Sequence, residues 1–402
     1  MIKRESGFSL IEMMIAVAIV SVILASAVTF FTLSVKQYKT QTKITASGME
    51  GIVGLEMLRR DLENMGFGLP WNNLQSYREI ETPLHAERMS LNDGSGIAPR
   101  AIAGIDNAFL TVNRSDYFAI KSTKIGIHPS SGKWTLLDHY GNKRVWGTAT
   151  ENLDNTSYVT IISVGNIDAN RRSLVNTTTD VRYSTIAQGH RPSDIYSTNI
   201  VYGIGDNMLP VRPFDRADYF VANAENSGSI VPTLTVPTHC APGTGVLVKG
   251  FVNHNIEGGM TPLPLLDCVA GMKVVYGIDT TGNGLADRWG GWENIRGVLG
   301  DTTIRSAAGI REHIVEVRVS ILAHEGQRDD SFTYPENEIF VGSIVDLPSG
   351  LVQSIGKVFN VGTQRNYRWR VYNLVVRPMG LNGGGARASG SLPPPPESII
   401  SN

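Results

Sequence analysis

The sequence predicts an α+β fold in which one long N-terminal helix packs on an antiparallel β-sheet. No proline occurs before Pro70, so nothing forces a break in a helix that begins near residue 8. The uncharged run at residues 13–31 is followed by an amphipathic pattern that continues the helix to about residue 66. Between residues 72 and 379, strand-like segments recur without helices between them, which favours antiparallel pairing with large loop insertions.

The charge composition bears on the class of partner to expect. The chain has 402 residues with 36 basic and 37 acidic side chains, giving a formal net charge of −1. A balanced charge gives no electrostatic reason to expect nucleic acid as a partner. The 42 glycines and 19 prolines favour short strands and long loops over a helical bundle.

The apolar run at residues 13–31 is long enough to cross a bilayer, because a helix of this length covers about 28 Å. Lys3 and Arg4 precede it and predict a cytoplasmic N-terminus, with the rest of the chain outside the inner membrane. Three later cations weaken this charge difference and are interpreted as a solvated stripe on one helical face: Lys36, Lys39 and Lys43.

One carboxylate, Glu12, lies at the head of this apolar stretch, where a charge is costly unless it is paired. An ordinary secretory signal places its small-residue cleavage site after the apolar core. Here Gly7 precedes the core, so cleavage before Phe8 would remove the cations and leave the helix on the mature chain. The alternative is a plain signal anchor with an incidental glutamate.

Residues 3–7 (KRESG) followed by residues 8–12 (FSLIE) resemble the class III signal of type IV pilins and type II secretion pseudopilins. The resemblance implies that a prepilin peptidase cleaves between Gly7 and Phe8 and methylates the new amine of Phe8. It also implies that Glu12 pairs with the N-terminal amine of a neighbouring subunit during assembly. Residues 1–7 are then the leader, residues 8–66 the pilin-like helix and residues 67–380 the β-rich head.

The second half of the predicted helix has one face suited to packing on a sheet. This face repeats at spacings of three and four residues. Its members are Ile44, Gly48, Gly51, Leu55, Leu58, Leu62 and Met65. The glycines allow close approach of the helix to a sheet, and Gly66, Gly68 and Pro70 end the helix.

Two departures distinguish the chain from major pilins, which commonly carry a proline and a glycine in the membrane half of the helix. Thr29 and Ser21 hold those places here, and the length also favours a minor pilin or a pseudopilin over the bulk subunit. Residues 58–67, residues 275–279 and the strand pattern VEVRVSIL resemble the PilW-like minor pilins, which are related to the J-type pseudopilins.

The head is predicted to contain eight strands. The clearest is HIVEVRVSILAH at residues 313–324, where apolar and polar side chains alternate. The others are expected at residues 109–112, 116–121, 158–164, 245–252, 271–278, 338–345 and 372–377. Residues 122–240 are interpreted as elaborated loops, with a subdomain inserted between sheet strands as the alternative.

The last residues, 381–402, are rich in glycine and then in proline. This composition predicts a disordered, partly polyproline-like tail. A solvated tail is the default interpretation, and a ligand for another protein is the alternative.

Cys240 and Cys268 are the two cysteines, and they are neither a Cys-x-x-Cys pair nor accompanied by histidines at zinc-finger spacing. A disulfide is favoured over two free thiols if the head is exported.

Residues 279–287 suggest either a calcium loop or a tight turn. The positions of an EF-hand loop are held by Asp279, Thr281, Asn283, Leu285 and Asp287, with Gly284 sixth, but Gly290 replaces the bidentate glutamate. A hairpin turn requires the same residue types and is the favoured interpretation; possible Ca²⁺ binding is the alternative.

No enzyme motif is present, the eight histidines are scattered, and we expect no catalytic activity. The resemblance implies a minor pilin that takes part in type IV pilus assembly at or near the pilus tip. Its partners would be other pilins, the prepilin peptidase and the inner-membrane assembly platform. It would reside in the inner membrane before assembly and then in the pilus at the cell surface. The alternatives are a type II secretion pseudopilin, or a pilus-borne adhesin that binds through residues 122–240.

Overall fold

The structure is a computed structural model that describes most of the chain after Ser9. The described residues are 9–72, 77–81, 86–94, 96–165, 171–176, 178–205, 209–227, 230–231, 234–254, 259–297, 304–347 and 350–381. Within these ranges, the side chains of residues 39–41, 43–50, 171, 226 and 296–297 are not described. The expected leader and the tail from residue 382 onward lie outside the described residues.

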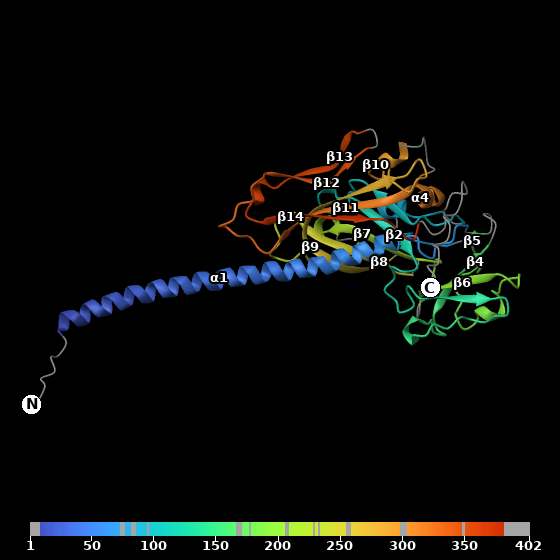
Figure 1. Cartoon of the computed structure of the whole chain (residues 1–402), viewed down its shortest axis with the longest axis horizontal. Coiled ribbons are helices and arrows are strands. Elements are labelled where there is room, and N and C mark those ends of the chain that lie inside the picture. The colour runs from blue at the N-terminus through green and yellow to red at the C-terminus, as the bar shows by residue number, and fades with distance from the viewer. Residues whose placement is uncertain are drawn as a thin grey trace, which may run out of the picture.

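A single helix, α1 (Leu10–Glu63), dominates the shape of the molecule. Its first half projects away from the head, and its second half lies along the sheet (Figure 1). Thr29 and Ser21, which hold the places of the proline and the glycine common in major pilins, donate their hydroxyls to carbonyls four residues earlier at 2.8 Å. Without a proline, the helix is continuous there. Gly66 and Gly68 follow its end with φ of 79° and 73°.

The main sheet has eight strands among the described residues, in the order β1-β2-β7-β8-β9-β11-β14, with β10 paired to β9. Every pairing in it is antiparallel. The strands are β1 (Ile102–Ile105), β2 (Tyr117–Ser122), β7 (Asp215–Ala222), β8 (Gly245–Val252), β9 (Met260–Ile278), β10 (Arg288–Gly290), β11 (Ile314–Glu325) and β14 (Arg368–Val376). The expected α+β fold, a long helix packed on an antiparallel sheet, is confirmed.

Most expected strands occur, but the one at residues 109–112 is wrong, and β9 and β14 begin earlier than expected. Residues 109–112 form a turn and the start of a 3-10 helix, η2 (Val112–Arg114). Asn113 and Arg114, which follow this turn, have φ of 51° and 52°, so the chain does not extend there. Strand β9 begins at Met260 rather than at residue 271. Its first half was not predicted because Pro262 and Pro264 interrupt the strand pattern of the sequence.

Among the described parts of residues 122–240, the structure shows long loops, the inserted subdomain and one strand of the main sheet, β7. A separate antiparallel sheet has the strand order β3-β6-β4-β5. Its strands are β3 (Trp134–Asp138), β4 (Tyr158–Val164), β5 (Arg171–Leu174) and β6 (Thr198–Gly205). This sheet has its own apolar core, which includes Leu137, Val159, Ile161 and Val201. The sequence did not predict this core because its strands are short and separated by polar segments.

A two-stranded hairpin, β12 (Glu338–Asp346) and β13 (Val352–Asn360), covers part of the main sheet. Val341 and Phe359 pack with Leu322 of β11, and Val345 and Ile355 pack with Val275 of β9. Three short helices complete the described head: α2 (Ala86–Ser90), α3 (Ala224–Ser227) and α4 (Ala307–His313).

Candidate assembly site and helix anchor

The first half of α1 is apolar and exposed along its length. The most apolar 18-residue window of Leu10–Tyr38 has a mean hydropathy of 2.6, and none of that window is buried in the molecule. By length and composition Leu10–Tyr38 can cross a membrane, and it contains the whole of the expected span at residues 13–31.

Glu12 lies in the first turn of this helix. The backbone amide of Ser9 donates to Glu12 Oε2 at 3.0 Å, so the carboxylate caps the helix N-terminus. Among the described residues, no cationic side chain forms an ion pair with Glu12. Gly7 and Phe8, the expected processing residues, lie outside the described residues. The charge of Glu12 is thus available to a partner from outside the described part of this chain.

The second half of α1 packs on β9 through the expected face. Gly51, Leu55, Leu58, Leu62 and Met65 are all buried. The side chain of Ile44 and the surroundings of Gly48 are not described. One residue was missed by the sequence reasoning: a Cβ built on Gly54 would overlap the carbonyl oxygen of Leu265 in β9. The helix backbone therefore contacts the strand directly at Gly54, as only glycine allows.

A buried polar contact also fixes α1 to the sheet. Lys249 Nζ of β8 lies 2.7 Å from Asp61 Oδ2, and the hydroxyl of Tyr219 in β7 donates to the same oxygen. Burial raises the pKa of the Asp61 carboxyl above its usual value, and the Lys249 charge opposes that rise. Nothing in the sequence paired Asp61 with a lysine 188 residues away.

A second group of buried charges fixes the segment after α1 against β2 and β7. Arg216 Nη1 lies 2.7 Å from Glu79 Oε2, and Arg216 Nε lies 2.7 Å from Asp218 Oδ1. Lys121 Nζ contacts the other oxygen of Glu79 at 2.7 Å, and the Tyr117 hydroxyl donates to Asp218. Burial lowers the pKa of the Arg216 guanidinium, but the neighbouring Asp218 and Glu79 carboxylates outweigh burial and raise it above its usual value. These contacts are structural, because they satisfy one another inside the head.

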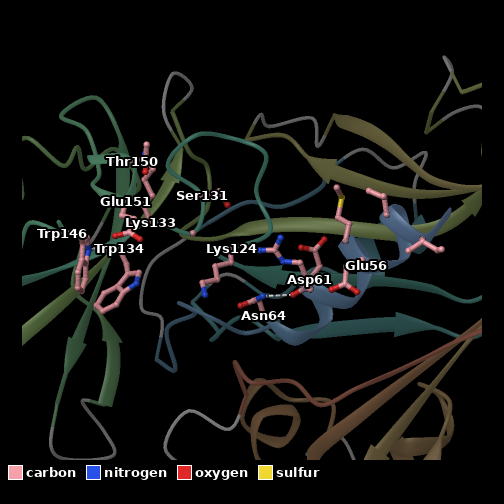
Figure 2. A pocket seen from close by; sticks show the side chains of 15 residues that line it. Glu56, Asp61, Asn64, Lys124, Ser131, Lys133, Trp134, Trp146, Thr150 and Glu151 are labelled. Atoms are coloured by element: carbon pink, nitrogen blue, oxygen red, sulfur yellow. Dashed lines mark hydrogen bonds between the residues drawn. The ribbon is translucent and has the colours of Figure 1, made fainter. Parts of the chain in front are cut away.

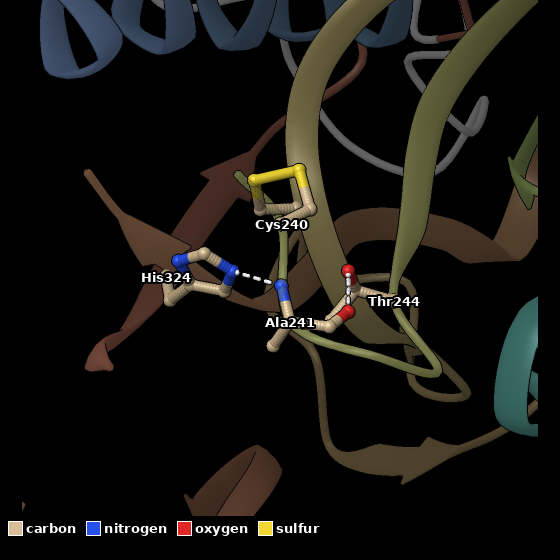
Figure 3. The surroundings of a disulfide bond; sticks show 5 residues. Cys240, Ala241, Thr244 and His324 are labelled. Carbon is tan, nitrogen blue, oxygen red and sulfur yellow. Dashed lines mark hydrogen bonds between the residues drawn. A yellow bond between two sulfur atoms is a disulfide. The ribbon is translucent and has the colours of Figure 1, made fainter. Parts of the chain in front are cut away.

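Cys240 and Cys268 form the expected disulfide, which joins the loop before β8 to the middle of β9 (Figure 3). Beside it, the amide of Ala241 donates to Nε2 of the buried His324 at 2.8 Å. His239 lies near both sulfurs, but two bonded sulfurs are not available as thiolate ligands for a metal.

The loop at residues 279–287 has the geometry of a turn between β9 and β10. Asp279 accepts hydrogen bonds from the amides of Thr281 and Gly284 at 2.9 and 2.7 Å. Asp287 accepts from the amide and the hydroxyl of Thr280, both at 2.9 Å. Burial raises the pKa of the Asp279 carboxyl, but the hydrogen bonds from Gly284 and Gly282 outweigh burial and lower it. Both carboxylates therefore stabilise the turn, and Ca²⁺ binding by this loop stays a prediction.

Comparison with known proteins bears on the N-terminus. The family model of the prokaryotic N-terminal methylation motif matches residues 2–28. Neither a search of curated proteins nor a search of solved structures gave a match. The matched range contains Gly7, Phe8 and Glu12.

The methylation motif, the exposed apolar helix and the antiparallel sheet together support a type IV pilin-like protein. Such a signal implies processing by a prepilin peptidase and assembly with other pilins in a type IV pilus or pseudopilus system.

Proposed function

We propose that this chain is a PilW-like minor pilin that takes part in type IV pilus assembly at or near the pilus tip. The observation that carries the proposal is Glu12 in the first turn of a membrane-length apolar helix, inside the matched methylation motif. The continuous α1 and the large head support a minor rather than a bulk subunit. The proposed role is assembly, with no catalytic step.

In the proposed mechanism, the apolar half of α1 is held in the inner membrane with the N-terminus in the cytoplasm. On assembly it moves into the filament core, where packing against other helices replaces lipid. Glu12 then pairs with the methylated amine of Phe8 on a neighbouring subunit. A buried charge without its partner costs several kcal/mol, so this pair sets the register of each addition.

Processing provides the direct test. Mass spectrometry of the mature protein should find N-methylated Phe8 as the first residue. Gly7→Ala should leave the full-length precursor on an immunoblot, because it adds a Cβ to the residue that precedes the proposed cut. Normal processing of this variant would count against a prepilin signal.

A deletion strain distinguishes a role in the type IV pilus from a role in type II secretion. The proposal expects loss of surface pili, restored by the wild-type chain, with type II secretion of exoproteins unchanged. Loss of secretion with normal pili would assign the chain to a pseudopilus instead.

A further inference from the structure

A cleft of about 1050 Å³ lies between the second half of α1 and the inserted subdomain (Figure 2). Ile52, Val53 and Met57 of α1 form one wall, and the first two are largely exposed. Trp134 and Trp146 form the opposite wall. The cleft is thus apolar on two sides and belongs to neither the membrane half of α1 nor its contact with β9.

The aromatic wall is held in place. The rings of Trp134 and Trp146 meet edge to face at 4.7 Å between centroids. The indole nitrogen of Trp146 donates to the Trp134 carbonyl at 2.6 Å, and the Arg144 guanidinium lies 4.4 Å from the Trp146 ring. Rigid aromatic side chains bind a ligand with little loss of conformational entropy.

The charges around the cleft nearly balance. The acidic residues that line it are Glu56, Asp61 and Glu151, and the basic ones are Arg60, Lys124 and Lys133, but Asp61 is already paired with Lys249. The remaining lining has one more basic than acidic side chain, which favours a ligand of low net charge.

The last described residues of the chain lie at the edge of this cleft. The amides of Met379 and Gly380 donate to the Glu63 carbonyl at 2.9 and 3.4 Å. Leu381 is buried against Gly66, just after the end of α1. Asn64, the residue after Glu63, lines the cleft. Leu381, the last described residue, therefore lies close to the cleft.

The residues that come next have the chemistry that such a cleft recognises. Residues 382–391 are mostly glycine, alanine and serine, and they are followed by Leu392 and the four prolines 393–396. A flexible linker of this length has a root-mean-square span of about 17 Å. Proline-rich segments adopt polyproline II at low entropic cost and dock in aromatic-lined grooves.

We propose that residues 392–400 of this chain bind in the cleft, with the prolines against Trp134 and Trp146. Ile399 and Ile400 then cover the exposed Ile52 and Val53. Tethering gives the segment an effective concentration in the millimolar range. A dissociation constant of about 0.1 mM is then sufficient to keep the cleft about nine-tenths occupied.

Peptide binding tests this directly. A chain ending at Leu381 and the full chain, both in detergent, are titrated into a fluorescein-labelled peptide of residues 382–402 and followed by fluorescence polarisation. The truncated chain should bind with a dissociation constant of about 0.1 mM or lower. The full chain should bind at least about tenfold more weakly, because its own segment occupies the cleft.

Two controls identify the contacts. A peptide in which residues 393–396 are alanine should lose most of its affinity for the truncated chain. In the truncated chain, Ile52→Glu should weaken binding, whereas Ile344→Glu on β12 should not. These side chains are matched, being 64 % and 62 % exposed, so neither change should unfold the protein.

Three outcomes would overturn the proposal. They are no binding of the peptide to the truncated chain at millimolar concentration, equal binding to both chains, and equal loss of affinity in both isoleucine variants. Equal binding to both chains would mean that the cleft is open and takes its ligand from another molecule. None of these outcomes depends on whether the chain enters a pilus.

Discussion

At the scale of single residues, Glu12 combines two roles that have different requirements. Its carboxylate accepts a hydrogen bond from the Ser9 amide at the start of α1, which any acceptor on a side chain of that length can do. Pairing with a neighbour's amine requires the negative charge itself. A variant that keeps the acceptor and removes the charge therefore separates the roles.

Glu12→Gln should be cleaved and methylated normally, yet enter the filament at least about tenfold less, which corresponds to about 1.4 kcal/mol of lost pairing energy. Quantitative immunoblotting of sheared pili against whole cells measures this ratio. Thr29→Ala, also on the exposed half of α1, serves as the control. Wild-type incorporation of the glutamine variant would show that assembly does not use the charge.

His254 makes the head sensitive to acid. Its Nε2 lies 3.2 Å from Oδ1 of the buried Asp215, whose carboxylate also contacts His128 Nε2 at 3.0 Å. Burial, followed by the nearby Arg212 charge, lowers the pKa of His254 to about 4. Asp215 is buried as well, but His128 and then His254 outweigh burial and lower its pKa to about 2.

Since the pKa of His254 is about 4 in the folded head and about 6.5 when unfolded, only the unfolded chain takes up a proton between these values. Stability should therefore fall as the pH drops from about 6.5 to 4, by up to about 3 kcal/mol. His254→Gln should have a shallower decline in Tm between pH 7 and 4.5, measured by circular dichroism. His324, whose pKa burial also lowers to about 4, remains in that variant and accounts for a residual slope. An unchanged slope would exclude His254 as the cause.

At the scale of elements, the contact of α1 with β9 depends on the absence of a side chain. The helix backbone at Gly54 lies against the Leu265 carbonyl, and Leu58 and Leu62 are fully buried on the same face. Asp61 and Lys249 add a charged contact about two turns after Gly54. The helix is thus positioned by shape first and by charge second.

Gly54→Ala should destabilise the protein by about 2 kcal/mol, because the added methyl group displaces the helix from the strand. Helix propensity alone would instead favour alanine by about 1 kcal/mol. Gly147→Ala, where an added Cβ meets nothing within 4 Å, is the matched control. Urea denaturation followed by tryptophan fluorescence gives both free energies, and stabilisation by Gly54→Ala would refute the close contact.

At the scale of the whole molecule, the head has a main sheet, an inserted subdomain and a covering hairpin. The disulfide joins the loop before β8 to β9, at the centre of the main sheet. Closing a loop of 28 residues stabilises the fold by about 3.5 kcal/mol on the chain-entropy estimate.

Replacing both Cys240 and Cys268 by alanine should therefore lower the free energy of unfolding by about 3 kcal/mol. Reducing the wild-type protein with dithiothreitol should have a similar effect, measured as the shift of the urea midpoint. The double variant should be insensitive to reductant. A wild-type midpoint that does not move with reductant would show that the cross-link contributes little.

The features that could be predicted from the sequence are local ones. The methylation motif, the length of the apolar run and the glycine-bearing face of α1 are each encoded within a few helical turns, where neighbours in sequence are neighbours in space. Strands such as β11 were visible because their side chains alternate over many residues. The disulfide was foreseen by counting cysteines and arguing from compartment.

Tertiary structure alone decided the rest, because it brings together residues that are far apart in the chain. Arg216 and Glu79, which are 137 residues apart, neutralise each other inside the head. The short strands of the inserted subdomain form a core only when they pair, and β9 continues through two prolines because β8 lies beside it. The cleft exists only because that subdomain lies opposite α1. The sequence by itself thus determined the methylation motif and the apolar helix, and the tertiary structure decided which surfaces the head presents.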